Sequence, residues 1–132
     1  MKAFNLKVVT PDGLLFDSEV ESLLIRTDDG DVEFLAGHID YMASIGTGRA
    51  RIKQDGKDRF ASVSGGFVTV KRGVVNLVAI TFEFRENIDL DRARAARDAA
   101  KSAISSSNDD KAIRLAKAKL ARAVNRIDVA EM

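Results

Sequence analysis

The sequence has no cysteine, no tryptophan, one proline and a single histidine, His38. Without cysteine there is no disulfide, no thiolate metal ligand and no thiol nucleophile, and one histidine does not supply the usual ligands of a zinc site. No run of residues approaches the roughly 20 apolar residues that a membrane-spanning helix requires. The sequence therefore predicts a protein that is cytosolic, or peripheral to something that is itself in a membrane.

An excess of one charge is also missing. The 132 residues include 21 Lys and Arg against 20 Asp and Glu, a net charge of +1, which gives no overall attraction to nucleic acid or to other polyanions. Apolar residues make up 45% and charged residues 31%, which is enough for a folded core and a soluble surface. This length and composition predict one ordinary domain or two small units.

Residues 1–85 have the pattern of an all-β domain. Apolar and polar residues alternate over 4–8, 49–53 and 68–71, so each segment offers one face to a core. Turn sequences separate such segments, and the strongest hairpin signal is Asp55-Gly56. Several short strands with no helix among them predict a β-sandwich or flattened barrel.

Residues 86–132 have a different composition. From Asn87 to Met132 there is no glycine, proline or aromatic residue, and alanine is the commonest residue, which predicts helix. Asp89 is the expected N-cap of a first helix, and a polar stretch over 105–110 ends it and caps a second. The predicted apolar faces are Ala93, Ala96, Ala100 and Ile104 on the first helix and Ile113, Ala116, Leu120, Val124 and Ile127 on the second.

The short connection between these helices predicts an antiparallel hairpin. The fold class is therefore α+β in two parts, an N-terminal β-sandwich followed by a C-terminal helical hairpin. Because the apolar faces of the hairpin are mostly alanine, burying them contributes far less than the ~1.5–3 kcal/mol of a buried leucine or isoleucine. We expect the hairpin to pack against the β domain, to pack against a partner, or to alternate between the two.

Candidate catalytic groups are few. Ser62 and Ser64 have no histidine nearby in sequence to act as a base, and turn carboxylates such as Asp28 are expected to bond to local backbone. Ser64-Gly65-Gly66-Phe67 opens a strand, so it lacks the helix N-terminus of a phosphate-binding glycine loop. His38 is expected to be a hydrogen-bonding or contact residue in a loop. The residues predict no enzyme active site and no metal site.

The second predicted helix carries the strongest local charge. Six cations occur on it with no acid between the first and the last, namely Lys111, Arg114, Lys117, Lys119, Arg122 and Arg126. From the residues alone, this helix is either a solvated flank or a surface for an acidic protein, nucleic acid or a phosphate ligand. Asp89 and Arg92 at the start of the first helix have a structural and a functional interpretation. The residues favour the structural one, because capping alone explains the acid and a local ion pair explains the arginine.

Several short motifs together resemble the epsilon subunit of bacterial F-type rotary ATP synthases over essentially the whole length. They are Val8-Val9-Thr10-Pro11-Asp12-Gly13, Gly37-His38, Ser64-Gly65-Gly66-Phe67, Ile88-Asp89-Leu90-Asp91-Arg92-Ala93 and Arg122-Ala123-Val124-Asn125-Arg126-Ile127. The order and spacing of these pieces, followed by an alanine-rich hairpin, carry the resemblance.

The resemblance implies a non-catalytic subunit of the central stalk, peripheral on the cytoplasmic face of the bacterial plasma membrane. The β-sandwich would dock on the gamma subunit and the c-ring of a proton- or sodium-translocating ATP synthase, with Asp31 and His38 among its contact residues. The hairpin would switch between a folded and an extended state, and the extended state would inhibit ATP hydrolysis. Its cations, from Lys111 to Arg126, would then face the catalytic alpha/beta head. Membrane association would come only through the complex, and no nucleic acid is implied.

The resemblance also implies a regulatory ATP site on the folded hairpin, with no cofactor otherwise required. The matching positions are Glu83, Ile88, Asp89, Arg92, Ala93, Arg122 and Arg126. Ala99 and Leu115 stand where relatives that bind ATP often carry a basic residue. The arginines are therefore either a triphosphate site or three side chains extended into water. The alternative function is a free-standing module that binds nucleotide or nucleic acid through the basic hairpin.

Overall fold

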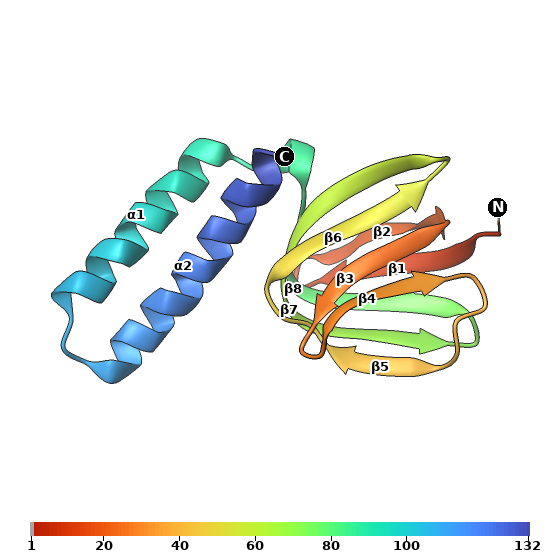
Figure 1. Ribbon diagram of the computed structural model, residues 1–132, viewed down its shortest axis with the longest axis horizontal. Helices are drawn as coiled ribbons and strands as arrows, with labels where there is room; N and C mark the ends of the chain where they lie inside the picture. The colour runs from red at the N-terminus through yellow and green to blue at the C-terminus, as the bar shows by residue number, and fades with distance from the viewer. Residues whose placement is uncertain (1) are drawn as a thin grey trace. The chain divides into compact units, whose positions relative to one another are not determined.

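The computed structural model describes residues 2–132. The chain forms two compact units, Met1–Phe84 and Arg85–Met132, which are considered separately below (Figure 1). Within the described residues, no helix is both long enough and apolar enough to cross a membrane.

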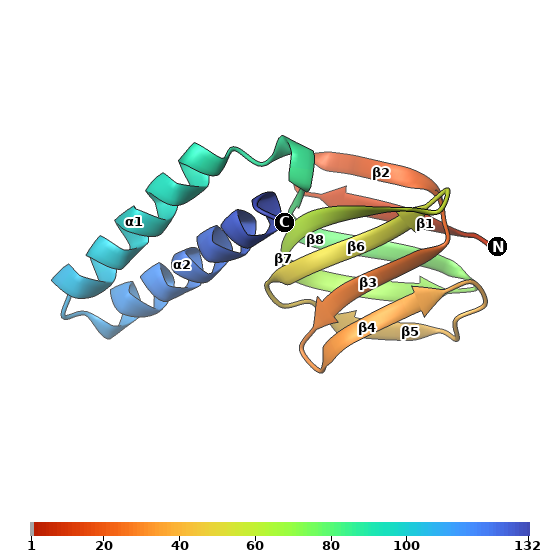
Figure 2. The same ribbon diagram turned by 45° about the horizontal axis from the view of Figure 1, so that its top comes forward.

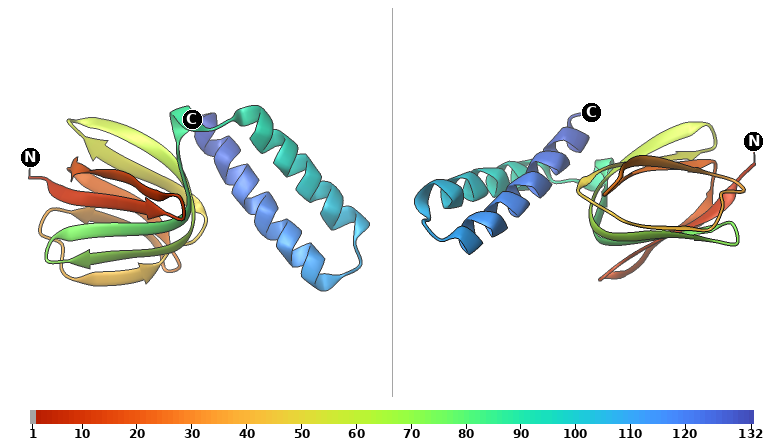
Figure 3. Two further views of the ribbon diagram at one scale, coloured as in Figure 1. Left: turned by 180° about the vertical axis from the view of Figure 1, so that it is seen from behind. Right: turned by 60° about the horizontal axis from the view of Figure 1, so that its bottom comes forward.

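The first unit is built from strands. Within residues 2–132 there are eight: β1 (Phe4–Thr10), β2 (Gly13–Val20), β3 (Ser22–Thr27), β4 (Gly30–Leu35), β5 (Tyr41–Ser44), β6 (Gly48–Gln54), β7 (Lys57–Lys71) and β8 (Val74–Phe84). Their order in the sheet is β2-β1-β8-β7-β6-β3-β4, and β5 pairs with β7. All pairs are antiparallel except β1 with β8. The sheet folds over into two layers, which the right-hand view of Figure 3 shows as a flattened barrel.

The long strand β7 passes from one layer to the other. Its first part pairs with β6 and its last part with β5. Between them, Gly65 and Gly66 have φ values of 70° and 106°. A Cβ on Gly66 would lie 1.9 Å from the carbonyl oxygen of Val78, so only glycine fits here. The glycine pair is therefore the corner of the sandwich. The sequence predicts that Ser64-Gly65-Gly66-Phe67 opens a strand, and this was wrong about the start, because β7 begins at Lys57 and runs through the glycine pair.

The core between the layers consists of large apolar side chains. Among its fully buried members are Phe34, Leu6, Leu23, Ile52 and Leu77. Leu6 and Ile52 lie in segments whose period-2 pattern predicts a core face, whereas Phe34, Leu23 and Leu77 lie outside the predicted segments. The strongest predicted hairpin is confirmed: Asp55 and Gly56 join β6 to β7 with φ values of 54° and 75°.

The second unit is helical. A short 3₁₀ turn, η1 (Arg85–Asn87), precedes α1 (Leu90–Ser106) and α2 (Asp110–Ala130). The side chain of Asp89 accepts a hydrogen bond from the amide of Arg92, and that of Asp109 accepts one from the amide of Lys111. Both are N-caps, as these residue types favour. The helices run antiparallel side by side (Figure 2), so the predicted fold class is confirmed.

Alanine fills the contact between the helices. The buried residues are Ala93 and Ala100 on α1, and Ala116, Ala123, Ile127 and Val129 on α2. Two predictions were wrong here, because Ala96 is exposed and Val124 is 38% exposed. Small side chains at seven-residue spacing give a narrow contact, so residues rotated further round each helix fall outside it.

Candidate functional site

One outer face of the β unit is apolar. Where β5, β7, β8, β1 and β2 lie side by side, five residues pair in register and point outward: Ser44, Phe67, Val78, Val9 and Leu14. Met42 and Ile80 lie two positions further along their own strands, so they share this face. We call the set Val9, Leu14, Met42, Phe67, Val78 and Ile80 the apolar sheet face.

Four members of the apolar sheet face are well exposed. Leu14 is 61% exposed, Met42 70%, Phe67 40% and Ile80 64%. The side chain of Ile80 lies over Gly65, where a Cβ would come within 2.7 Å of its Cδ1 atom. A contiguous apolar patch on a folded unit is typical of a surface that binds another protein.

A groove adjoins the apolar sheet face at Met42. It has a volume of about 510 Å³ and is lined by Asp40, Tyr41, Met42, Thr69, Val70, Lys71 and Asn76. The carboxylate of Asp40 accepts a hydrogen bond from the backbone amide of Arg72 at 3.0 Å, which ties the β4–β5 connection to the β7–β8 turn. The groove thus combines apolar side chains with one carboxylate, one lysine and neutral polar groups.

This face was not predicted from the sequence. The available signal was β8, which reads Val-Val-Asn-Leu-Val-Ala-Ile-Thr-Phe and is apolar at successive positions rather than at alternate ones. Such a strand has an apolar side chain on both faces, and one of these faces is outside the core.

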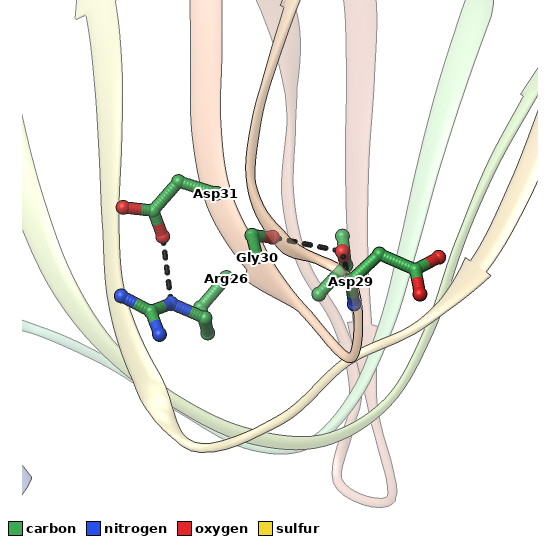
Figure 4. A network of polar contacts seen from close by, with 5 residues as sticks. Arg26, Asp29, Gly30 and Asp31 are labelled. Atoms are coloured by element: carbon green, nitrogen blue, oxygen red, sulfur yellow. Dashed lines mark hydrogen bonds and ion pairs between the residues drawn. The ribbon is translucent and has the colours of Figure 1, made fainter.

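Asp31 lies at the β3–β4 turn. Its carboxylate accepts a hydrogen bond from Nε of Arg26 at 2.8 Å, and each side chain is 53% exposed. The turn itself is held by Thr27, whose hydroxyl donates to the carbonyl of Gly30 and accepts from the amide of Asp29. Figure 4 shows the carboxylate of Asp29 pointing away from the Arg26–Asp31 pair. Asp31 is therefore accessible but already paired.

His38 lies in the connection after β4, at the other end of that strand from Asp31. Its ring centroid is 4.9 Å from that of Phe34 and 5.7 Å from that of Tyr41. Its Nδ1 lies 2.7 Å from the carbonyl oxygen of Ile39, so Nδ1 is the donor. This packing fixes the loop and leaves Ile39 77% exposed at its tip. Asp31 and His38 thus lie at separate ends of β4.

The six cations of α2 do not share one environment. Lys111, Arg114, Lys117 and Lys119 are exposed, whereas Arg122 and Arg126 are partly buried. In addition, Nε of Arg126 is fully buried. The resemblance assigns Arg122 and Arg126 both to the partner surface and to the nucleotide site. These two are therefore the least exposed of the six cations.

Three arginines lie on one flank of the helix pair, and we call Arg92, Arg122 and Arg126 the arginine flank. Each stands directly before a buried residue of its own helix (Ala93, Ala123 and Ile127). In an antiparallel pair, the flanks that precede the buried faces adjoin one another. The distance of each arginine from the connection between the helices, measured along the helix axis, follows from the rise per residue of an α-helix. These three distances lie within about 3 Å of a common value, so the three arginines lie at the same height on the hairpin.

The remaining predicted nucleotide residues are Asp89, Ala93, Ile88 and Glu83. Asp89 caps α1 through its bond to the amide of Arg92, at 3.1 Å. Ala93 is fully buried, and the amide of Ile88 donates to the carbonyl of Arg85 at 3.3 Å. Glu83 belongs to β8 in the β unit, opposite Ser62. Within residues 2–132, no group of three His, Asp or Glu side chains is arranged to hold a metal ion.

The two units define the class of the protein, a β-sandwich joined to an antiparallel helical hairpin. The family of ATP synthase delta/epsilon chains has a β-sandwich domain that matches residues 3–85 and a long α-helix domain that matches residues 86–131. The chain therefore belongs to this family and, within it, to the ATP synthase epsilon subunits. The resemblance found in the sequence motifs is confirmed.

Curated relatives match over almost the whole chain. The ATP synthase epsilon chains of Bacillus velezensis and Bacillus subtilis are each 42% identical over 130 residues, which is 98% of this chain and 98% of the relative. The epsilon chain of Alkalihalophilus pseudofirmus is 39% identical over the same shares of both chains.

Solved structures share the fold. A chain in the mitochondrial ATP synthase of Euglena gracilis, in its OSCP/F1/c-ring part, superposes with a TM-score of 0.83 at 24% identity, covering 98% of this chain and 82% of that one. A chain in the central stalk and c-ring of the Tetrahymena thermophila enzyme gives 0.70 at 11% identity, with 96% and 95% covered. At these identities the comparison establishes the fold alone.

Proposed function

We propose that this chain is a non-catalytic rotor subunit of a proton- or sodium-translocating ATP synthase. The β unit binds the gamma subunit and the c-ring, and the hairpin restrains ATP hydrolysis. The chain is peripheral on the cytoplasmic face of the bacterial membrane and is held there by the complex. The observation that carries this proposal is the apolar sheet face, which is a surface for a partner and contains no catalytic groups.

The composition of this face fits a lasting contact. The exposed side chains of Phe67, Ile80, Met42 and Leu14 are large, and covering apolar side chains of this size contributes about 1.5–3 kcal/mol each. Subunits that stay together bury more apolar area than partners that meet transiently. A subunit of the stalk, which must transmit torque, is a partner of this kind.

Co-purification with the membrane-bound ATPase tests the docking. We expect Phe67→Glu and Ile80→Glu each to reduce recovery of the chain with the complex by about thirty-fold or more, as for a central residue of an interface. Leu115→Glu is the matched control, because Leu115 is also apolar and 57% exposed but lies on α2. Full recovery of both β-unit variants would refute docking through this face. Failure of the unaltered chain to co-purify would favour the free-standing ligand-binding module.

Inhibition by the hairpin is supported by its charge. Four of the six α2 cations are exposed on the folded hairpin, and extension would present all six to an acidic surface of the catalytic head. Removing residues after Ile88 should leave the β unit folded, since the core between its layers uses residues up to Phe84 only. Hydrolysis by the complex should then rise. An unchanged rate with assembly intact would contradict this route of inhibition.

ATP as a regulatory ligand is supported by the arginine flank. Three guanidiniums at one level repel one another unless water or an anion lies between them, and a triphosphate satisfies all three. A ligand bound only by the folded hairpin stabilises that state, which would be the non-inhibitory one.

Titration of the isolated full-length chain with ATP tests this site. The melting temperature of the hairpin should rise, and Arg122→Ala and Arg126→Ala should weaken the rise. Arg114→Ala is the control, because Arg114 is an exposed cation of the same helix that does not precede a buried residue. If millimolar ATP gives neither a shift nor heat of binding, the nucleotide site is wrong and the docking proposal is unaffected.

A further inference from the structure

An ion pair joins the two helices at the open end of the hairpin. Nη2 of Arg94, in the second turn of α1, lies 3.2 Å from Oε1 of Glu131, the C-cap of α2. The backbone amide of Glu131 donates to the carbonyls of Ile127 and Val129, so the end of the helix is also held by its own cap. The opposite end of the hairpin is closed covalently by the chain over 107–109.

The position of this ion pair allows it to oppose separation of the two helices. Helices that are tied at one end separate from the other end, and the pair spans that free end. Four of the six buried residues of the helix pair are alanines, Ala93, Ala100, Ala116 and Ala123, whose methyl groups contribute little each, and only Ile127 and Val129 are larger. In such a contact, one ion pair is a larger share of the closing free energy than it would be in a core of leucines.

The pair lies on the side away from the arginine flank. Arg94 directly follows the buried Ala93, whereas Arg92 directly precedes it. The two arginines therefore project from opposite flanks of α1. An anion bound at the arginine flank and the Arg94–Glu131 pair can hold the same end of the hairpin at the same time without sharing a group.

We propose that the Arg94–Glu131 ion pair is a latch that keeps the hairpin folded, and that the hairpin opens only when this pair parts. The role of the latch in inhibition rests on the proposed function of the hairpin. Its effect on how often the hairpin opens does not depend on that function. The latch acts without nucleotide, so it sets the equilibrium between folded and extended hairpin in the free chain. A ligand at the arginine flank would shift that equilibrium further.

Hydrogen exchange of the full-length chain tests the latch. The amides of α1 and α2 should exchange about two- to five-fold faster in Arg94→Glu and in Glu131→Arg than in the unaltered chain at low salt, the range expected for exposed pairs. The double variant Arg94→Glu/Glu131→Arg restores opposite charges and should return exchange to its original rate. In 1 M salt, the difference between the single variants and the unaltered chain should shrink.

Two controls belong to the same experiment. Lys101→Glu makes the same charge change at an exposed position of α1 and should leave the exchange rates unchanged. The amides of β7 and β8 should be unaffected in every variant. The latch is refuted if the single variants exchange like the unaltered chain, or if the double variant exchanges as fast as they do. Faster exchange with unchanged ATP hydrolysis by the complex would uphold the latch and refute inhibition by the hairpin.

Discussion

The two units of this chain are stabilised in different ways. In the β unit, the side chains of Phe34, Leu6 and Leu23 are fully buried between two layers. In the hairpin, four of the buried residues are alanines, Ala93, Ala100, Ala116 and Ala123, and the larger ones are Ile127 and Val129. A buried large side chain contributes about 1.5–3 kcal/mol, whereas one methyl group contributes about 0.8 kcal/mol. The β unit is thus held by many large buried side chains, and the hairpin by fewer and smaller ones, as the proposed exchange of hairpin contacts requires.

This difference separates binding from regulation. Under the proposed function, the surface that stays attached to the rotor lies on the unit with the larger core, because the apolar sheet face is on that unit. The proposed change of partner by the basic helix would cost only a few kcal/mol, because that helix lies on the unit with the weaker contact. Four substitutions test the comparison, and they are given in order of the expected effect.

Gly66→Ala should have the largest effect, and it should fall on the β unit. The new Cβ would lie 1.9 Å from the carbonyl oxygen of Val78, at a φ of 106° that alanine rarely adopts. Strain and displaced backbone together should cost about 3–5 kcal/mol of unfolding free energy. Urea unfolding followed by circular dichroism in the β region measures it. Gly73→Ala is the control, with φ 79° and no atom within 4 Å, and should cost about 1 kcal/mol. Equal losses would contradict the corner role of Gly66.

Ala100→Leu should be the next largest, and it should fall on the hairpin. Ala100 is 5% exposed in the contact between the helices, so a leucine there must push them apart. Overpacking of this kind costs about 1–3 kcal/mol. Hydrogen exchange of α1 and α2 amides measures the loss, with β7 amides as an internal reference. Ala99→Leu, at an exposed position one residue earlier, should change little. If both variants behave alike, the alanine contact is not close-packed.

Much of this fold could be predicted from local patterns. Alternation over 4–8 and 49–53, the Asp55-Gly56 turn and the caps Asp89 and Asp109 each follow from chemistry within a few residues. The passage of β7 between layers could not, because it depends on Val78 approaching Gly66 from another strand. The exposed positions of Ala96 and Val124 were missed for a related reason: the width of a helix contact depends on how closely the partner approaches.

The candidate site was predictable in part only. The residues of the arginine flank were named from motif positions, and their common flank follows from the buried alanines beside them. The apolar sheet face was not found, since a strand that is apolar on both sides does not show which side is the core. Arg94 and Glu131 lie 37 residues apart, and only the antiparallel packing brings them together.

Asp109→Ala should have a smaller effect and also fall on the hairpin. Its side chain accepts a hydrogen bond from the amide of Lys111 at 3.2 Å and so satisfies one free donor of the first turn of α2. Loss of such a cap costs about 0.5–2 kcal/mol. Asn108→Ala, one residue before the cap, is the control and should be close to neutral. The helical signal on heating measures both, and a larger loss for Asn108→Ala would show that the cap is misassigned.

Asp31→Asn should have the smallest effect on stability, because the core of the β unit does not depend on its surface charges. The substitution keeps the shape of the side chain and removes the charge that pairs with Arg26, and both side chains are 53% exposed. Pairs this exposed contribute about 0.2–1 kcal/mol, so we expect a loss below about 0.5 kcal/mol in urea unfolding. The same kind of pair at Arg94–Glu131 should alter hairpin opening measurably, since there it closes a weaker contact. If Asp31→Asn lowers the free energy of unfolding by more than about 1 kcal/mol, the β unit depends on an exposed ion pair as the hairpin does. The proposed difference between the two units would then be wrong. If stability is kept while recovery with the ATPase complex falls, Asp31 is a docking residue whose charge serves the partner rather than the fold.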